Sequence, residues 1–117
     1  PIFKTSFETY PDYLFAKINY AVQCLRKKQI EKIKEIFPSF SLEKLFPKRT
    51  SFHVSEFRGF MTLLSHYHMK RKDLPKAREY YQKAYEADPS HPSVVFLEKK
   101  LFPKSFIKRA FLKLARF

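Results

Sequence analysis

The stretch Asp73–Pro89, DLPKAREYYQKAYEADP, determines the fold of this chain more than any other. Ala77, Tyr81 and Ala84 recur in it at spacings of four and three residues, which places them on one face of a helix. Two small side chains on that face allow a second helix to approach closely, and the tyrosine fills the space between them. The stretch therefore predicts a helix at about 74–87 that packs tightly against a neighbouring helix.

The residues around this helix indicate where it begins and what it packs against. Asp73 is expected to cap its N-terminus, and Pro75 falls in a first turn that needs no backbone N–H donor. The preceding segment, about 54–71, is predicted to be the partner helix because it has a continuous apolar stripe. That stripe comprises Val54, Phe57, Phe60, Met61, Leu64 and Met69.

A similar pattern occurs 44 residues earlier in the chain. At this offset the basic run 26–28 falls on the basic run 70–72, so two helix–turn–helix units are predicted, at about 12–37 and 54–88. Each unit alone leaves its apolar face uncovered, so the two are expected to stack. Outside the helix pair 54–71 and 74–87, helices are expected at 12–27, 29–37, 42–46 (capped by Ser41 within an irregular connector, 38–52), 92–101 and 106–117.

Residues 58–89 resemble a tetratricopeptide repeat, although Ser65 stands where that family prefers glycine and His68 where it prefers tyrosine. The resemblance implies an all-α fold in which antiparallel hairpins over 1–103 stack as a short right-handed solenoid, capped by a C-terminal helix at 104–117. It also implies a scaffold or adaptor that binds proteins and has no enzymatic activity. The matching residues are Met61, Leu64, Ser65 and His68, followed by Ala77, Tyr81, Ala84 and Pro89.

In that family the first helix of each hairpin lines a concave groove for a peptide or partner protein. Family members that grip a terminal carboxylate use lysine and asparagine there, but Ile18 and Val22 hold the matching positions here. A hydrophobic segment, or the chain's own C-terminal helix, is the expected occupant instead. By position, the groove residues are Phe15, Ile18, Val22 and Leu25 in the first unit, and Gly59, Thr62, His66, Met69 and Lys70 in the second.

Charge supports a different function. The chain has 24 Lys and Arg against 11 Asp and Glu, a net charge of +13, and residues 99–117 include no acid. Such a field attracts nucleic acid, anionic membrane or an acidic protein surface, and binding of nucleic acid or anionic membrane through 99–117 is the alternative function. A homodimer contact through the same amphipathic segment is a further alternative, as is a purely solvating surface. The cations on its polar face are Lys104, Lys108, Arg109, Lys113 and Arg116.

Several function classes lack the residues that they require. A single glycine, Gly59, is too few for a phosphate-binding loop, and no residues assemble a catalytic group, so no cofactor is expected. His66 and His68 are two apart on a helix and cannot share a metal ion, so no metal site is expected. The lone cysteine, Cys24, is expected in the core; with no signal peptide or ~20-residue apolar run, a cytoplasmic location is expected.

Overall fold

The computed structural model describes residues 14–102, and all regular structure within that range is helical, as the sequence predicts. The predicted helix at 106–117, with its cationic residues, lies outside the described residues. The helices that the structure describes are α2 (Leu14–Arg26), α3 (Lys32–Ile36), α4 (Leu42–Leu45), α5 (Val54–Lys70), α6 (Leu74–Ala87) and α7 (Pro92–Leu101).

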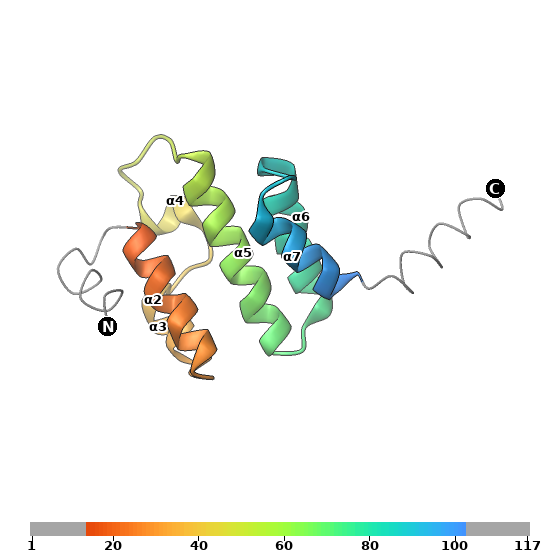
Figure 1. Ribbon diagram of the computed structural model, residues 1–117. Coiled ribbons are helices and arrows are strands. Elements are labelled where there is room, and N and C mark those ends of the chain that lie inside the picture. Colours follow the sequence, from red (N-terminus) through yellow and green to blue (C-terminus); the bar gives the residue numbers. More distant parts are fainter. Residues whose placement is uncertain (1–13, 103–117) are drawn as a thin grey trace.

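Helix α5 is the centre of the arrangement (Figure 1). Helices α2, α3 and α4 lie on one side of it, and α6 and α7 lie on the other. α5 and α6 form an antiparallel hairpin, α2 packs against both α3 and α5, and α7 packs against both α6 and α5. Because α5 is covered on two sides, it contributes more buried side chains than any other described helix.

The contact between α5 and α6 is as close as the alanine spacing predicts. Ala77 and Ala84 are fully buried, and Tyr81 is buried beside them. The Ser65 hydroxyl of α5, also fully buried, donates a 2.7 Å hydrogen bond to the Ala77 carbonyl oxygen of α6. Small side chains on both helices therefore bring the two backbones close, and the Ser65 hydroxyl is satisfied within the contact.

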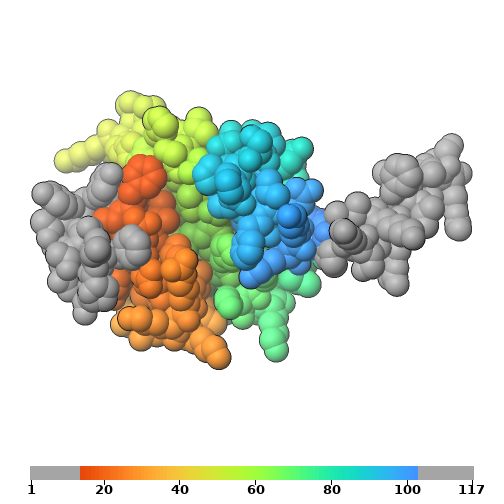
Figure 2. Space-filling view, viewed as in Figure 1, coloured from red at the N-terminus to blue at the C-terminus, as the bar shows by residue number. Residues whose placement is uncertain are grey.

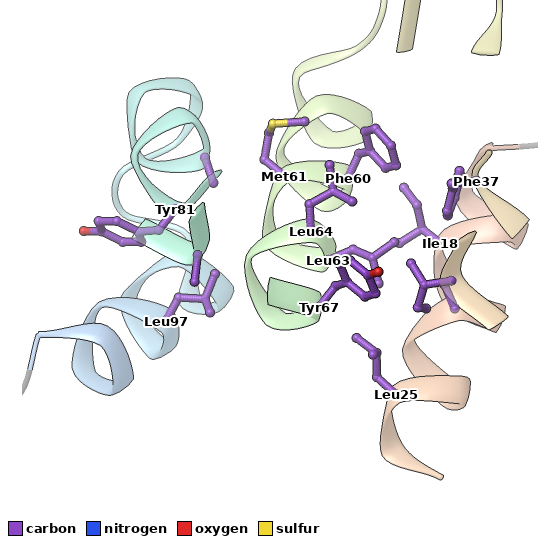
Figure 3. Close-up of a cluster of buried hydrophobic side chains, with 14 of the residues drawn as sticks. Ile18, Leu25, Phe37, Phe60, Met61, Leu63, Leu64, Tyr67, Tyr81 and Leu97 are labelled. Atoms are coloured by element: carbon purple, nitrogen blue, oxygen red, sulfur yellow. The ribbon is translucent and has the colours of Figure 1, made fainter. Parts of the chain in front are cut away.

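On its other side, α5 packs against α2 and the segment after α3. Figure 3 shows Ile18 and Phe37 facing the buried α5 side chains, with Tyr81 and Leu97 on the far side of α5. The ring centroids of Phe37 and Phe60 lie 4.9 Å apart, and the two ring planes are inclined at 56°. Both side chains are fully buried. Cys24 is buried, as expected. One continuous core extends from α2 through α5 to α7.

The turns after α2 and α5 have the same backbone geometry at the 44-residue offset. Lys28 and Lys72 both adopt positive φ, at 61° and 62°. After α2, the Gln29 N–H donates to the Cys24 carbonyl at 2.8 Å; after α5, the Asp73 N–H donates to the His68 carbonyl at 2.9 Å. These bonds define a Schellman motif, with a left-handed residue just beyond the helix.

Two boundary predictions need correction. The helix expected at 29–37 spans only Lys32–Ile36, because left-handed Lys28 ends α2 and the next residues form a turn. Ser41 does precede α4, but its side chain makes no capping hydrogen bond. Its own N–H instead donates to the Ser39 hydroxyl at 3.2 Å.

Helices α5, α6 and α7 begin with side-chain caps, and the sequence did not suggest two of these caps. Asp73 caps α6 as predicted, accepting a 3.3 Å hydrogen bond from the Lys76 N–H. Histidines cap α5 and α7: Nδ1 of His53 accepts from the Ser55 N–H at 3.2 Å, and Nδ1 of His91 accepts from the Ser93 N–H at 3.1 Å. An imidazole nitrogen thus takes the place of the usual Asp or Ser oxygen.

The N-terminus of α5 is further fixed by an ion pair with the connector. Glu56, almost fully buried, accepts two 2.8 Å hydrogen bonds from the Arg49 guanidinium and a 2.9 Å bond from the His53 N–H. The Arg49 guanidinium also lies 4.4 Å from the Phe52 ring centroid. The bond from Arg49 holds the pKa of the Glu56 carboxyl below its usual value, despite burial.

Candidate partner-binding site

A hollow of about 410 Å³ opens between α2, α5 and α7. In the space-filling view α5 (green) is visible between α2 (orange) and α7 (blue), on the face turned to the viewer (Figure 2). Three helices that are distant in sequence therefore line one surface. The lining residues are Val22, Leu25 and Arg26 of α2, Leu63, His66 and Lys70 of α5, and Phe96 and Lys100 of α7.

Helical spacing puts these residues on the surface of the hollow. Leu63, His66 and Lys70 of α5 follow one another at three and four residues, so they form one stripe along that helix. Leu63 is 1% exposed and belongs to the floor, whereas Phe96 is 51% exposed and stands on the rim. The hollow thus has an aliphatic floor and one large aromatic ring that solvent reaches.

The charged groups around the hollow are all cationic. Arg26, Lys70 and Lys100 are exposed members of the lining, which includes no Asp or Glu. The Lys100 ammonium lies 4.6 Å from the Phe96 ring centroid, a distance at which a cation is attracted to the ring face. No carboxylate within the described range forms an ion pair with any of these three cations.

His66 lies among these groups as a neutral side chain. Its ring centroid is 6.2 Å from that of Phe96. Burial, together with the nearby charges of Lys100 and Lys70, lowers the pKa of His66 to about 4. At neutral pH the imidazole is therefore uncharged, with one nitrogen able to donate a hydrogen bond and the other to accept one.

The structure brings together four of the nine groove residues suggested by position. Val22, Leu25, His66 and Lys70 line the hollow. Ile18 and Thr62 are buried and do not belong to the lining of this hollow. The remaining three, Phe15, Gly59 and Met69, are partly buried and do not belong to the lining.

The buried pair is accounted for by contacts within the core. The Thr62 hydroxyl donates a 2.9 Å hydrogen bond to the Gly59 carbonyl. Ile18 packs close to the same glycine, where a Cβ atom would lie 3.6 Å from Ile18 Cδ1. Ile18 therefore packs against α5, whereas the Thr62 hydroxyl is bonded within α5 itself.

Sequence reasoning missed half of the lining, namely Arg26, Leu63, Phe96 and Lys100. A signal for Arg26 was present, because it falls on Lys70 at the 44-residue offset. No signal placed α7 beside this surface, since α7 lies outside both repeat units. The sequence alone therefore did not predict that cations from α2, α5 and α7 surround one hollow.

A second hollow, of about 470 Å³, lies between the connector, α5 and α6. Its α5 residues, Phe57 and Met61, lie on a different face of that helix from Leu63 and His66. It is mainly aromatic and contains one acidic and one basic residue. Its lining comprises Phe40, Ser41, Leu42, Glu43, Phe52, Phe57, Met61, Tyr80 and Lys83.

The described residues 14–102 contain no cluster of three or more His, Cys, Asp or Glu side chains that could hold a metal ion. His68 stacks on Tyr80 with the rings 5.3 Å apart and 2° from parallel, on the side of α5 away from His66. Within the same range, no helix has the length and apolar character needed to cross a bilayer.

Comparison of the chain with protein-family models, with curated proteins and with solved structures gave no match.

Proposed function

We propose that this chain is a protein-interaction module of the tetratricopeptide kind, which binds a peptide segment of a partner protein in the hollow between α2, α5 and α7. The two hairpins, α2 with α3 and α5 with α6, would stack as a short right-handed solenoid. The identical Schellman turns after α2 and α5 support this repeat relationship. On this proposal the helices are a scaffold, and the function lies in the surface that they present.

The observation that carries the proposal is the exposed Phe96 ring on the rim of a hollow with a buried aliphatic floor. Binding sites are concave and lined mainly by hydrophobic and aromatic side chains, and a few large side chains usually provide most of the binding energy. Other exposed apolar residues, such as Val54 and Tyr85, line neither hollow. Among the exposed large apolar residues of the described range 14–102, Phe96 is the one that lines either of these two hollows.

The test is selection of binders from a random peptide library displayed on phage, with the full chain as bait. Phe96→Ala is the site variant and Val54→Ala is the matched control, because both remove an exposed apolar side chain (51% and 53% exposed). We expect selected peptides to bind Phe96→Ala about tenfold more weakly or worse and to bind Val54→Ala normally. Failure to enrich any peptide that distinguishes the two variants would overturn the proposed function.

The charge of the chain favours one alternative, a basic binder of nucleic acid or anionic membrane acting through 99–117. Its test uses the full chain with Lys104, Lys108, Arg109, Lys113 and Arg116 replaced by Gln. The probes are poly(U) RNA and vesicles with 30 mol% phosphatidylserine. Binding that disappears in this variant, and that falls steeply with added salt, supports the alternative, since phosphate contacts release counterions. Peptide binding that the same variant retains, and that added salt weakens without abolishing, supports the hollow.

A further inference from the structure

From the charges around the hollow we infer that its partner is an acidic segment: a stretch of polypeptide with several Asp or Glu side chains flanking one large apolar side chain. This inference rests on the proposed function and narrows it to one chemical class of partner.

Three separate helices contribute the positive charge. Arg26 comes from the end of α2, Lys70 from the end of α5 and Lys100 from α7. Like charges gathered around one concave surface repel each other, and the described residues supply no carboxylate partner to offset that repulsion. A bound segment with Asp or Glu side chains would remove this repulsion and gain charge-assisted hydrogen bonds.

The floor of the hollow indicates what lies between those carboxylates. Val22, Leu25 and Leu63 are aliphatic, so the floor favours an apolar side chain over a charged or strongly hydrated group. Phe96 on the rim would lose much of its exposed surface against such a side chain. A nucleic acid strand would neutralise the cations equally well, but the aliphatic floor offers its bases no flat stacking surface beyond Phe96.

His66 is suited to the same partner. A neutral imidazole within a cationic ring adds no further repulsion, and it can donate a hydrogen bond to a carboxylate. The second hollow differs, because its lining contains one acid, Glu43, and one base, Lys83. Charge therefore distinguishes the two surfaces and assigns the acidic partner to the hollow between α2, α5 and α7.

The experiment uses two triple variants of the full chain with the same net charge. The site variant replaces Arg26, Lys70 and Lys100 with Gln. The control variant replaces Lys44, Lys48 and Lys76, which are exposed and line neither hollow, also with Gln. Three labelled 12-residue probes are compared by fluorescence anisotropy: a peptide with one Phe flanked by six Asp and Glu, the same peptide with Asn and Gln at the acidic positions, and the acidic peptide with Ala in place of Phe.

We expect the acidic Phe peptide to bind the wild-type chain and the control variant alike, and the site variant at least about tenfold more weakly. The Asn/Gln peptide and the Ala peptide should each bind the wild type at least about tenfold more weakly than the acidic Phe peptide. Binding by the wild type should weaken as NaCl rises from 50 to 300 mM, but should not vanish, because the apolar contact remains.

The other outcomes overturn the inference in different ways. Equal loss in both triple variants would mean that overall charge, and not this hollow, attracts the peptide. Phage selection that yields peptides without acidic residues, still sensitive to Phe96→Ala, would reject the acidic partner while leaving the proposed function intact. Poly(U) RNA that binds the wild type but not the site variant, with no probe peptide bound, would replace the acidic segment with nucleic acid.

Discussion

The Ser65 hydroxyl donates a 2.7 Å hydrogen bond to the Ala77 carbonyl at the buried contact between α5 and α6. The tetratricopeptide family, which this segment resembles, prefers glycine at the position of Ser65. Serine is small enough to keep the two helices close, and its buried hydroxyl is satisfied by an acceptor on the facing helix. The departure from the family pattern thus has a physical explanation.

We predict that Ser65→Ala lowers the free energy of unfolding by about 1 kcal/mol, the usual net contribution of one buried hydrogen bond. Ser65→Val should cost more, about 1–3 kcal/mol beyond the lost bond, because its extra methyl groups have no space in the contact. Urea unfolding followed by circular dichroism measures both values. A Ser65→Val chain as stable as Ser65→Ala would contradict the close packing of α5 on α6.

The two left-handed lysines predict stabilising substitutions. Lys28 and Lys72 adopt φ of 61° and 62°, a region in which glycine is free of the steric cost that a Cβ atom imposes. Lys28→Gly and Lys72→Gly should each raise the free energy of unfolding by roughly 0.5–1 kcal/mol, with additive effects in the double variant. Lys27→Gly, at a residue with no positive φ, is the control and should not stabilise. Thermal unfolding compares the midpoints of these four variants with that of the wild type.

Gly59 predicts a stabilising substitution of the opposite kind. It lies inside α5 without positive φ, and a Cβ atom there would meet Ile18 Cδ1 at 3.6 Å, an ordinary van der Waals distance. Gly59→Ala should therefore stabilise the chain by roughly 0.5–1 kcal/mol, as expected for alanine over glycine in a helix interior. Gly59→Leu, which would press against α2, should destabilise it. The unfolding midpoints in urea distinguish these two results.

Glu56 predicts a change in acid stability. Its pKa is lowered in the folded chain, first by the hydrogen bonds from Arg49. The carboxylate therefore contributes stability that is present above its unfolded pKa and is lost as the pH falls through its folded pKa. Glu56→Gln should remove part of the stability difference between pH 6 and pH 3, and at pH 7 it should cost about 1 kcal/mol for the weakened helix cap. A pH profile identical to that of the wild type would contradict the role of this carboxylate.

His66 predicts a second pH effect, in a different range. Its pKa is about 4 in the folded chain, mainly because of burial, against about 6.5 for an unperturbed histidine. Between these values the unfolded chain binds the extra proton, so the free energy of unfolding falls as the pH drops from 6.5 to 4, by up to about 1.4 kcal/mol per pH unit. His66→Gln should flatten this part of the profile, measured by urea unfolding at fixed pH values. An unchanged slope in that range would contradict a buried, neutral His66.

The same residue reports on the bound partner. Arg26, Lys70 and Lys100, from three helices, surround the hollow in which His66 lies, and a bound acidic peptide would offset their charge. The pKa of His66 should then rise from about 4, with proton uptake on binding near pH 5. Titration calorimetry in buffers of different ionisation enthalpy measures that uptake. Asn/Gln probe peptides are the control and should cause no such shift.

The sequence by itself determined the features that depend on near neighbours along the chain. The Ala77, Tyr81 and Ala84 spacing predicted α6 and its close packing face, and Asp73 predicted its cap. The 44-residue offset aligned the end of α2 with the end of α5, and the turns that follow these two helices have matching hydrogen bonds. Helix periodicity and capping act within a turn or two, so a single stretch of chain contains the information.

Only the tertiary structure decided what the candidate site contains. Periodicity identified Ile18 as an apolar face residue, but packing determined that it is buried against α5 and does not line a groove. Likewise, Phe96 and Lys100 join Arg26 and Lys70 only because α7 folds back onto α5. The physical reason is that the position of one helix against another depends on the side chains of both, and no local pattern in either one specifies it.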